Sequence, residues 1–265
     1  MLFYSRKNRY CAASFLLTRK GGRDKIILPN ERSTTMKIHG FQKTTLLDYP
    51  GKVACTVFTG GCNMRCPFCH NASLVLTPDN TPLFPEEEIL SYIYKRRGIL
   101  DGVAITGGEP LINHDISDFI KKIKDVGLSV KLDTNGTSPE KLRELVESKL
   151  VDYVAVDIKN SYEKYPETVG ISGFNIEPVK KSVEFLLRGH VDFEFRTTAV
   201  LEFHKPEDFI DIGKMIEGAP RYFIQAYKDS GDIISGGLHP LSDEEYKKCL
   251  DNVKPYVKNA ELRGI

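Results

Sequence analysis

Short β-rich runs alternate with longer helical segments through most of this sequence, and the alternation limits the folds open to the chain. Residues 53–59 (VACTVFT) contain β-branched and aromatic side chains and end at two glycines, as a buried strand does. Residues 102–106 form the next such run, and a helical pattern from Asp115 to Gly127 follows them. Because neighbouring parallel strands need a crossover connection, this rhythm predicts a parallel sheet with helices outside it.

The alternation continues toward the C-terminus and gives six βα units. Further strands are predicted at residues 128–132, 153–158, 192–198 and 221–227, and helices at 85–98, from 138, at 178–188 and at 206–217. Ser242 with Glu245 forms a capping box for a last long helix, which Pro255 should kink or end. We expect an α/β fold, either open or curved toward a barrel, with active-site residues at the carboxyl ends of the strands.

The composition is that of a globular protein, with 265 residues of which 41% are hydrophobic and 28% charged. Residues 1–35 carry eight Lys or Arg against two Asp or Glu, whereas 36–265 carry 29 basic and 34 acidic residues. We expect 1–35 to be an N-terminal extension outside the fold, with Met36 as the true start and 36–265 as one domain. The body lacks the basic excess of a nucleic-acid binder, and no apolar run approaches the roughly 20 residues of a membrane span. Neither nucleic acid nor a membrane is an expected partner.

Three of the six cysteines, Cys62, Cys66 and Cys69, lie in one short segment with the spacing C-x3-C-x2-C. One loop can then present three thiolates to a single inorganic centre. A structural zinc ion would need a fourth ligand, and His70 adjoins Cys69 too closely to complete a tetrahedron without strain. Three cysteines without a clear fourth ligand suit a cubane cluster with one iron left open. Such clustering indicates metal chemistry in a reducing compartment, so the cytoplasm is the expected location.

Two further motifs follow strands of the predicted sheet. Gly107-Gly108-Glu109-Pro110 comes directly after the second strand, where the glycines allow a close approach to a ligand and the carboxylate can accept hydrogen bonds from an ammonium group. Residues 133–136 (DTNG) end the third strand, and without further context they are typical of an Asx turn that leads into the next helix.

The cysteine motif, with the aromatic Phe68 before its last cysteine, resembles that of the radical S-adenosylmethionine (SAM) superfamily. The resemblance implies a partial (β/α)6 TIM-like barrel of the radical SAM type and a [4Fe-4S] cluster on the three cysteines. SAM would chelate the fourth, open iron. It also implies that Gly107, Gly108 and Glu109 contact SAM, with Glu109 as acceptor for its methionine amino group.

Within this superfamily the chain resembles the glycyl-radical enzyme activases. In those enzymes a DTNG at this place contacts SAM, as Asp133 and Asn135 would here, and the next strand ends in Asp-x-Lys, here Asp157 to Lys159. The resemblance implies that these side chains reach the SAM ribose or carboxylate, around a monovalent cation in the pyruvate formate-lyase type. Arg196 stands where another SAM contact is implied, although an arginine on a buried strand is equally compatible with a salt bridge.

The nearest form is the long form of the anaerobic ribonucleoside-triphosphate reductase activating protein. Residues 39–52 of this chain resemble the segment that precedes the cluster loop in that form. The implied reaction gives one electron to SAM and forms methionine and a 5′-deoxyadenosyl radical, which takes hydrogen from a glycine Cα of the partner enzyme. Because no further ferredoxin-like cysteine set is present, the electron would come from a separate reduced flavodoxin or ferredoxin-type donor.

Two alternatives remain open. One is a radical SAM enzyme that acts on a small molecule, such as 7-carboxy-7-deazaguanine synthase, which shares the cysteines and GGEP but carries Glu where this chain has Asp133. The other is an iron-sulfur or zinc module without SAM chemistry. Outside the motifs, Cys11 and Cys55 lack ligand spacing, and Cys249 is interpreted as a core thiol. His204 and His239 are interpreted as loop residues without a nucleophile to pair with.

Overall fold

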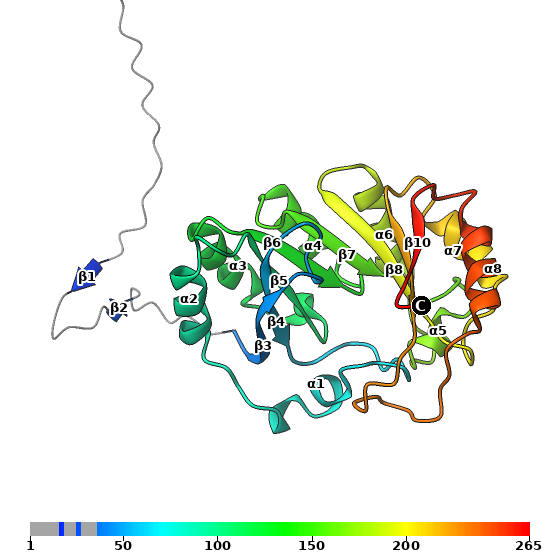
Figure 1. Cartoon of the computed structure of the whole chain (residues 1–265), viewed down its shortest axis with the longest axis horizontal. Helices are drawn as coiled ribbons and strands as arrows, with labels where there is room; N and C mark the ends of the chain where they lie inside the picture. Colours follow the sequence, from blue (N-terminus) through cyan, green and yellow to red (C-terminus); the bar gives the residue numbers. More distant parts are fainter. Residues whose placement is uncertain (1–15, 19–24, 28–35) are drawn as a thin grey trace, which may run out of the picture. The chain divides into compact units, whose positions relative to one another are not determined.

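The computed structural model describes residues 16–18, 25–27 and 36–265 (Figure 1). Two compact units are present, Met1–Thr34 and Thr35–Ile265. In the first unit, β1 (Leu16–Thr18) pairs antiparallel with β2 (Lys25–Ile27). The expected extension and its start at Met36 concern a segment that lies largely outside the described residues, so both stay predictions. The rest of the fold concerns the second unit.

Eight strands form one sheet in the order β10-β9-β8-β7-β6-β5-β4-β3. Their bounds are β3 (Ile38–Thr45), β4 (Ala54–Thr59), β5 (Gly102–Gly107), β6 (Ser129–Thr134), β7 (Tyr153–Asp157), β8 (Asp192–Ala199), β9 (Tyr222–Ala226) and β10 (Ala260–Arg263). The strands from β4 to β10 are parallel, and β3 is antiparallel to β4. Since β3 and β10 are the two edges, the sheet is a curved, incomplete barrel (Figure 1).

Helices connect the parallel strands and cover the outside of the sheet (Figure 1). Their bounds are α1 (Ala72–Leu76), α2 (Glu86–Lys95), α3 (Ile116–Asp125), α4 (Pro139–Glu147), α5 (Tyr165–Thr168), α6 (Glu177–Leu187), α7 (Asp208–Met215) and α8 (Asp243–Val253), with the 3-10 turns η1 (Pro78–Asn80) and η2 (Pro110–Ile112). The capping box of Ser242 and Glu245 is present at the start of α8, which ends two residues before Pro255. Within the described residues no helix has both the length and the apolar composition that crossing a membrane requires.

The α/β fold and the six predicted βα units are confirmed, with strand ends shifted by at most two residues. Two strands of the second unit, β3 and β10, were not predicted. The second half of β3 exposes Gln42, Lys43 and Thr44, because it lies at an edge and has no regular apolar alternation. Strand β10 has only four residues, AELR, none of which is β-branched or aromatic.

The two faces of the sheet differ in polarity, and this difference positions the site. On β6, Val130 and Leu132 belong to the main apolar core, whereas Lys131 between them is buried on the other face. On β8, Phe193 and Phe195 alternate with Glu194 in the same way. The apolar face packs against the helices, so the inner face of the incomplete barrel carries charged side chains.

Candidate functional site

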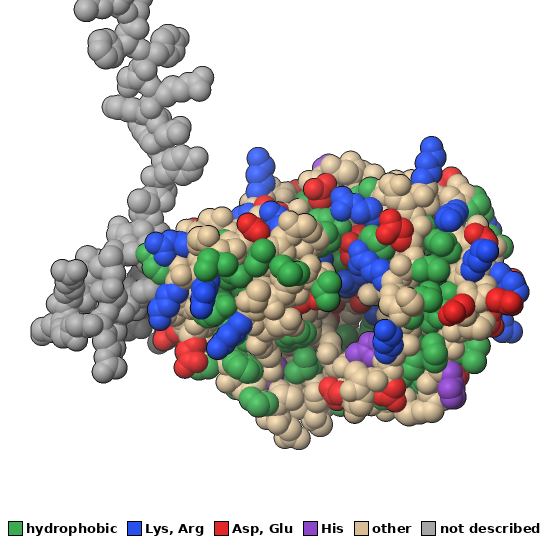
Figure 2. Space-filling model, in the orientation of Figure 1, with side chains coloured by type: hydrophobic (Ala, Val, Ile, Leu, Met, Phe, Trp, Pro, Cys, Tyr) green, Lys and Arg blue, Asp and Glu red, His purple; other side chains and the backbone are tan. Residues whose placement is uncertain are grey.

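The three cysteines of the motif lie in the loop after β4 and open into one cavity of about 160 Å³. All three are free thiols, with Cys66 buried and Cys62 and Cys69 partly buried. The loop is fixed through its backbone, because Gly61 N donates to Leu74 O (2.8 Å) and Arg65 N donates to Val169 O (2.9 Å). The cavity also contains every residue that the sequence predicted for SAM binding except Arg196, namely Phe68, Gly107, Gly108, Glu109, Asp133, Asn135, Asp157 and Lys159. The space-filling view shows a hollow in this face of the body, with basic and histidine side chains beside it (Figure 2).

The cysteine loop would favour neutral thiols if it held no metal. Burial raises the pKa of Cys66 to about 12, and it also raises the pKa of Cys62. The nearby ammonium group of Lys159 opposes this rise at both thiols. Since metal ions bind thiolates, loading this loop with a metal centre should release protons.

The residues present fit an iron-sulfur cluster better than a single metal ion. Within the described part of the chain, no three His, Cys, Asp or Glu side chains converge closely enough to hold one ion. In a cubane each thiolate binds a different iron, so three sulfurs around a cavity are the arrangement that a cluster needs. His70 lines the same cavity and its ring stacks on Tyr227 with centroids 5.5 Å apart, but among the described residues it does not join the cysteines in a group that could hold one ion.

The glycines of GGEP bring this turn into direct contact with the cysteine loop. Gly107 has φ +113°, a region that favours glycine, and a Cβ on Gly108 would lie 1.8 Å from the Gly61 carbonyl oxygen. Glu109 N donates to the same carbonyl oxygen at 2.8 Å. No other residue fits at position 108 without moving the cysteine loop.

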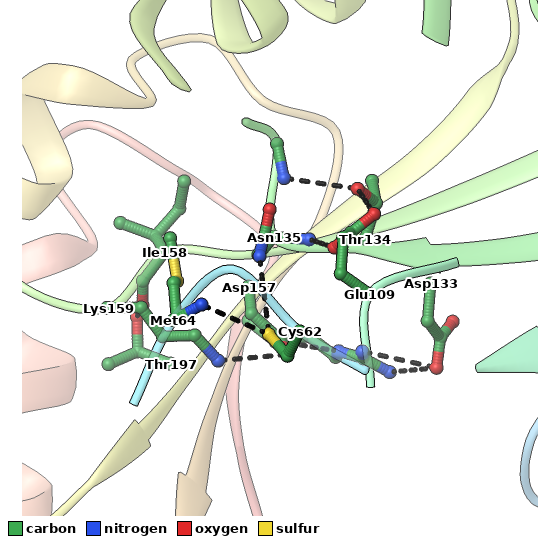
Figure 3. Close-up of polar contacts among 12 residues, drawn as sticks. Cys62, Met64, Glu109, Asp133, Thr134, Asn135, Asp157, Ile158, Lys159 and Thr197 are labelled. Atoms are coloured by element: carbon green, nitrogen blue, oxygen red, sulfur yellow. Dashed lines mark hydrogen bonds and ion pairs between the residues drawn. The ribbon is translucent and has the colours of Figure 1, made fainter. Parts of the chain in front are cut away.

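Glu109 connects the GGEP turn to the DTNG turn. Its side chain is 1% exposed and accepts hydrogen bonds from Leu111 N (3.0 Å), Thr134 Oγ1 (2.7 Å) and Asn135 N (2.7 Å) (Figure 3). Burial raises the pKa of this carboxyl to about 7, against the lowering effect of the three donors. The sequence motif did not predict this internal role. Contact of Glu109 with a SAM amino group stays a prediction.

Asp133 and Asp157 meet at the carboxyl ends of β6 and β7, where Arg196 joins them (Figure 3). The guanidinium lies 3.3 Å from Asp133 Oδ2 and 3.0 Å from Asp157 Oδ1. Lys159 Nζ lies 3.2 Å from Asp157 Oδ2, and Lys131 forms an ion pair with Asp133. Of the two interpretations of Arg196, the salt bridge is therefore present, and a SAM contact stays a prediction.

Three cations surround two carboxylates in this group. Burial alone would raise the pKa of Asp133 and of Asp157, but Arg196 and the lysines hold both pKa values below their ordinary range. Lys131 was not predicted from the sequence. It stands two positions before Asp133 on one strand, so strand alternation places both side chains on the same face.

The remaining candidates lie outside the cavity. Cys55 is in β4 and Cys249 in α8, both in the apolar core as free thiols, as expected for Cys249. His239 is a loop residue, as the sequence predicted, and it pairs with Glu202. His204 is also a loop residue, as the sequence predicted, and it is 1% exposed, which the sequence did not indicate.

Comparisons with known proteins agree with this geometry. The family described as the radical SAM superfamily matches residues 56–216. A Methanocaldococcus jannaschii protein named "Putative glycyl-radical enzyme activating enzyme" is 34% identical over 86% of this chain and 96% of its own length. The pyruvate formate-lyase 1-activating enzyme of Escherichia coli K12 is 29% identical over 86% of this chain and 94% of its own length.

A solved structure supports the fold alone. SuiB of Streptococcus suis, in a crystal structure bound to S-adenosylmethionine, superposes with a TM-score of 0.62 at 14% identity. The match covers 78% of this chain and 49% of SuiB, so the chain spans about half the length of that protein. Together with the cysteine cavity at the carboxyl ends of the strands, these matches show that the chain belongs to the radical SAM superfamily and groups there with the glycyl-radical enzyme activating enzymes.

Proposed function

We propose that this enzyme cleaves SAM reductively and forms a glycyl radical on a partner enzyme, the anaerobic ribonucleoside-triphosphate reductase. The observation that carries the proposal is the single cavity shared by three free cysteines, the GGEP and DTNG turns and the charged ends of β7 and β8. When bound, a [4Fe-4S] cluster supplies one electron that breaks a carbon-sulfur bond of SAM, giving methionine and a 5′-deoxyadenosyl radical.

The cysteine loop would hold the cluster through Cys62, Cys66 and Cys69. Its backbone is fixed by Val169 and by the tight contact between Gly61 and Gly108, so the three thiolates keep their separation. No fourth cysteine lies in the cavity lining, so one iron of a cluster held here would be open to the amino and carboxylate groups of SAM.

The charged group would orient SAM. Three cations against two carboxylates leave an excess positive charge beside the cavity, which suits the carboxylate of an amino acid. Asn135 lies near the cysteines, with its Nδ2 3.8 Å from Cys62 Sγ, and Glu109 holds that turn in place. Gly107 and Gly108 allow a ligand to approach the backbone. These residues would bind and orient SAM and exclude water from it. The bonds that break and form belong to SAM and the partner.

The second half of the reaction concerns the partner. The radical would take hydrogen from a glycine Cα, which produces 5′-deoxyadenosine and leaves the unpaired electron on the glycine. Support for a glycyl-radical partner comes from the relatives, which are named as activating enzymes and match over 94% or more of their lengths. The reductase as partner rests on the resemblance of residues 39–52, and the electron would come from a reduced flavodoxin or ferredoxin-type donor.

The proposal is tested by electron paramagnetic resonance. The chain, reconstituted with iron and sulfide without oxygen, is reduced and incubated with SAM and an anaerobic ribonucleotide reductase. We expect a glycyl-radical signal that a Gly→Ala variant of the reductase lacks. SAM cleavage without a radical on the reductase, but with a radical on another glycyl-radical enzyme, would contradict the choice of partner and leave the activase class intact.

A further inference from the structure

We infer that His204 is a positioning residue, which fixes the backbone of Lys159 and the ring of Phe68 on two sides of the cavity. The consequence for SAM rests on the proposed function, whereas the contacts themselves do not. His204 follows β8, is 1% exposed and does not line the cavity. It acts through its neighbours, so it is not a catalytic residue.

The two ring nitrogens of His204 contact different segments. Nδ1 lies 3.1 Å from Val200 N and 3.2 Å from the Val200 carbonyl oxygen, and in the neutral ring that carries its hydrogen on Nε2 it accepts from Val200 N. Nε2 lies 2.7 Å from the Lys159 carbonyl oxygen, which can only accept, so Nε2 carries the hydrogen and donates it. Burial lowers the pKa of the ring, which agrees with this neutral form. The imidazole therefore connects the segment after β8 to the segment after β7.

The segment after β7 carries Lys159, and its next residue is held in the same way. Asn160 is fully buried, and its Nδ2 donates to Phe203 O and to Thr168 Oγ1, both at 2.9 Å. The Lys159 backbone N–H donates to Tyr165 Oη at 3.3 Å. The main chain at Lys159 is thus held from both sides, which limits where its ammonium group can lie beside Asp157 and the thiols.

The histidine ring also supports the cysteine loop. Its centroid lies 6.1 Å from that of Phe68, and the neighbouring Phe203 ring lies 5.7 Å from Phe68. Phe68 stands between Cys66 and Cys69, so the ring contacts that fix Phe68 also limit the positions of two thiols. The His204 side chain therefore contacts both the cysteine loop, which would hold the cluster, and the segment of Lys159, which would orient SAM.

The inference predicts how substitutions of His204 differ. His204→Phe keeps the approximate volume of the ring but leaves Val200 N and the Lys159 carbonyl oxygen buried without partners. His204→Gln offers one acceptor and one donor and can restore much of the connection. Phe209→Leu is the matched control, because the Phe209 ring lies 6.1 Å from His204 yet makes none of these hydrogen bonds.

The first measurement is amide hydrogen exchange of the full chain, without metal or SAM. His204→Phe should exchange faster at residues 158–161 by about tenfold or more, whereas His204→Gln and Phe209→Leu should stay within about threefold of the wild type. Unchanged exchange at 158–161 in His204→Phe, or an equal increase in Phe209→Leu, would overturn the inference. If His204→Phe does not fold, His204→Asn takes its place, because its shorter side chain cannot reach the Lys159 carbonyl oxygen: a greater increase at these amides than in Phe209→Leu supports the inference, and an equal or smaller one contradicts it.

The second measurement is SAM affinity of the reconstituted, reduced proteins by equilibrium dialysis, with iron content and the cluster spectrum recorded in parallel. We expect His204→Phe to keep its iron and to bind SAM about tenfold more weakly, with recovery in His204→Gln. Equal SAM affinity in His204→Phe and wild type would contradict the role in SAM orientation. A wild type that binds no SAM would instead contradict the proposed function, while the exchange result still decides whether His204 holds Lys159.

Discussion

Two arginine–carboxylate groups lie on the inner face of the sheet, and they differ in whether they line the cysteine cavity. Arg196 bridges Asp133 and Asp157 at the edge of the cysteine cavity, where the Asp157 side chain is still 34% exposed. Two positions earlier on β8, Glu194 is 1% exposed and receives both terminal nitrogens of Arg263, at 3.1 and 3.3 Å. We call the first group open because Asp133 and Asp157 line the cavity, and the second closed because neither Glu194 nor Arg263 lines it, although Arg263 is 37% exposed.

The difference lies in what each group leaves unsatisfied. Glu194 also accepts a hydrogen bond from Tyr153 Oη at 2.9 Å, so its carboxylate has partners on both oxygens and joins β10 to the middle of the sheet. The group around Arg196 has more cations than carboxylates and faces free thiols. A buried ion pair is therefore weak evidence for function by itself, and an open cavity beside unbalanced charge is the better indicator.

The largest contrast between open and closed positions is expected from the cysteines. Cys66→Ala should lose both iron binding and SAM cleavage, because it removes one of the three proposed ligands. Cys249→Ala, in the closed core, should keep both and lose only about 1 kcal/mol of unfolding free energy. Iron analysis and a SAM-cleavage assay after anaerobic reconstitution measure the two properties. A Cys66→Ala variant with intact cluster content would show that Cys66 is no more a ligand than Cys249.

The two arginines give the next contrast. Arg196→Met should reduce kcat/KM for SAM cleavage by about a hundredfold, since it removes the bridge that holds Asp133 and Asp157 beside the cavity. Arg263→Met should leave kcat/KM within about threefold but reduce the unfolding free energy by about 3 kcal/mol, because Glu194 would stay buried without its cation. Denaturant unfolding and steady-state kinetics of both variants separate these effects. Equal kinetic losses would show that the closed group also serves the site.

The pH dependence of stability sharpens the account of the open group. Because the pKa values of Asp133 and Asp157 are held below the ordinary 3.8, their favourable contribution is complete above about pH 4 and is lost only at lower pH. Without Arg196 the pKa of both carboxyls rises, because burial is then opposed by the lysines alone. The stability difference between wild type and Arg196→Met should therefore shrink as the pH falls from 7 to about 3, since the wild type loses more of its favourable ionisation there. A difference that is the same at both pH values would contradict these assignments.

The smallest effect is expected from removing residues 1–35. Met36 is 3% exposed and its backbone nitrogen lies 2.7 Å from Glu86 Oε2, a carboxylate that also binds Lys122. A free amino group at Met36 would keep that contact and add charge to it. We expect 36–265 to keep its iron content and to melt within about 2 °C of the full chain. A large loss of either would show that the first 35 residues contribute to the domain.

The order of strands and the place of the motifs could be predicted from the sequence, because strand runs, glycines and caps are local patterns. The edge strand β3 could not, since the exposed side chains of Gln42 and Lys43 break its alternation. His204 could not be assigned either, because its partner Lys159 lies 45 residues away and the contact depends on how two segments pack. Glu109 was found through its motif, but its bonds to the DTNG turn required the structure.

The central claim is that Cys62, Cys66 and Cys69 hold a cluster with one iron open to SAM. The most direct measurement incubates the anaerobically reconstituted, reduced protein with SAM and quantifies methionine and 5′-deoxyadenosine by mass spectrometry. The account predicts both products in equal amounts, and neither from Cys66→Ala. An intact cluster that yields neither product, or a protein that carries zinc in a complete four-ligand site, would contradict it.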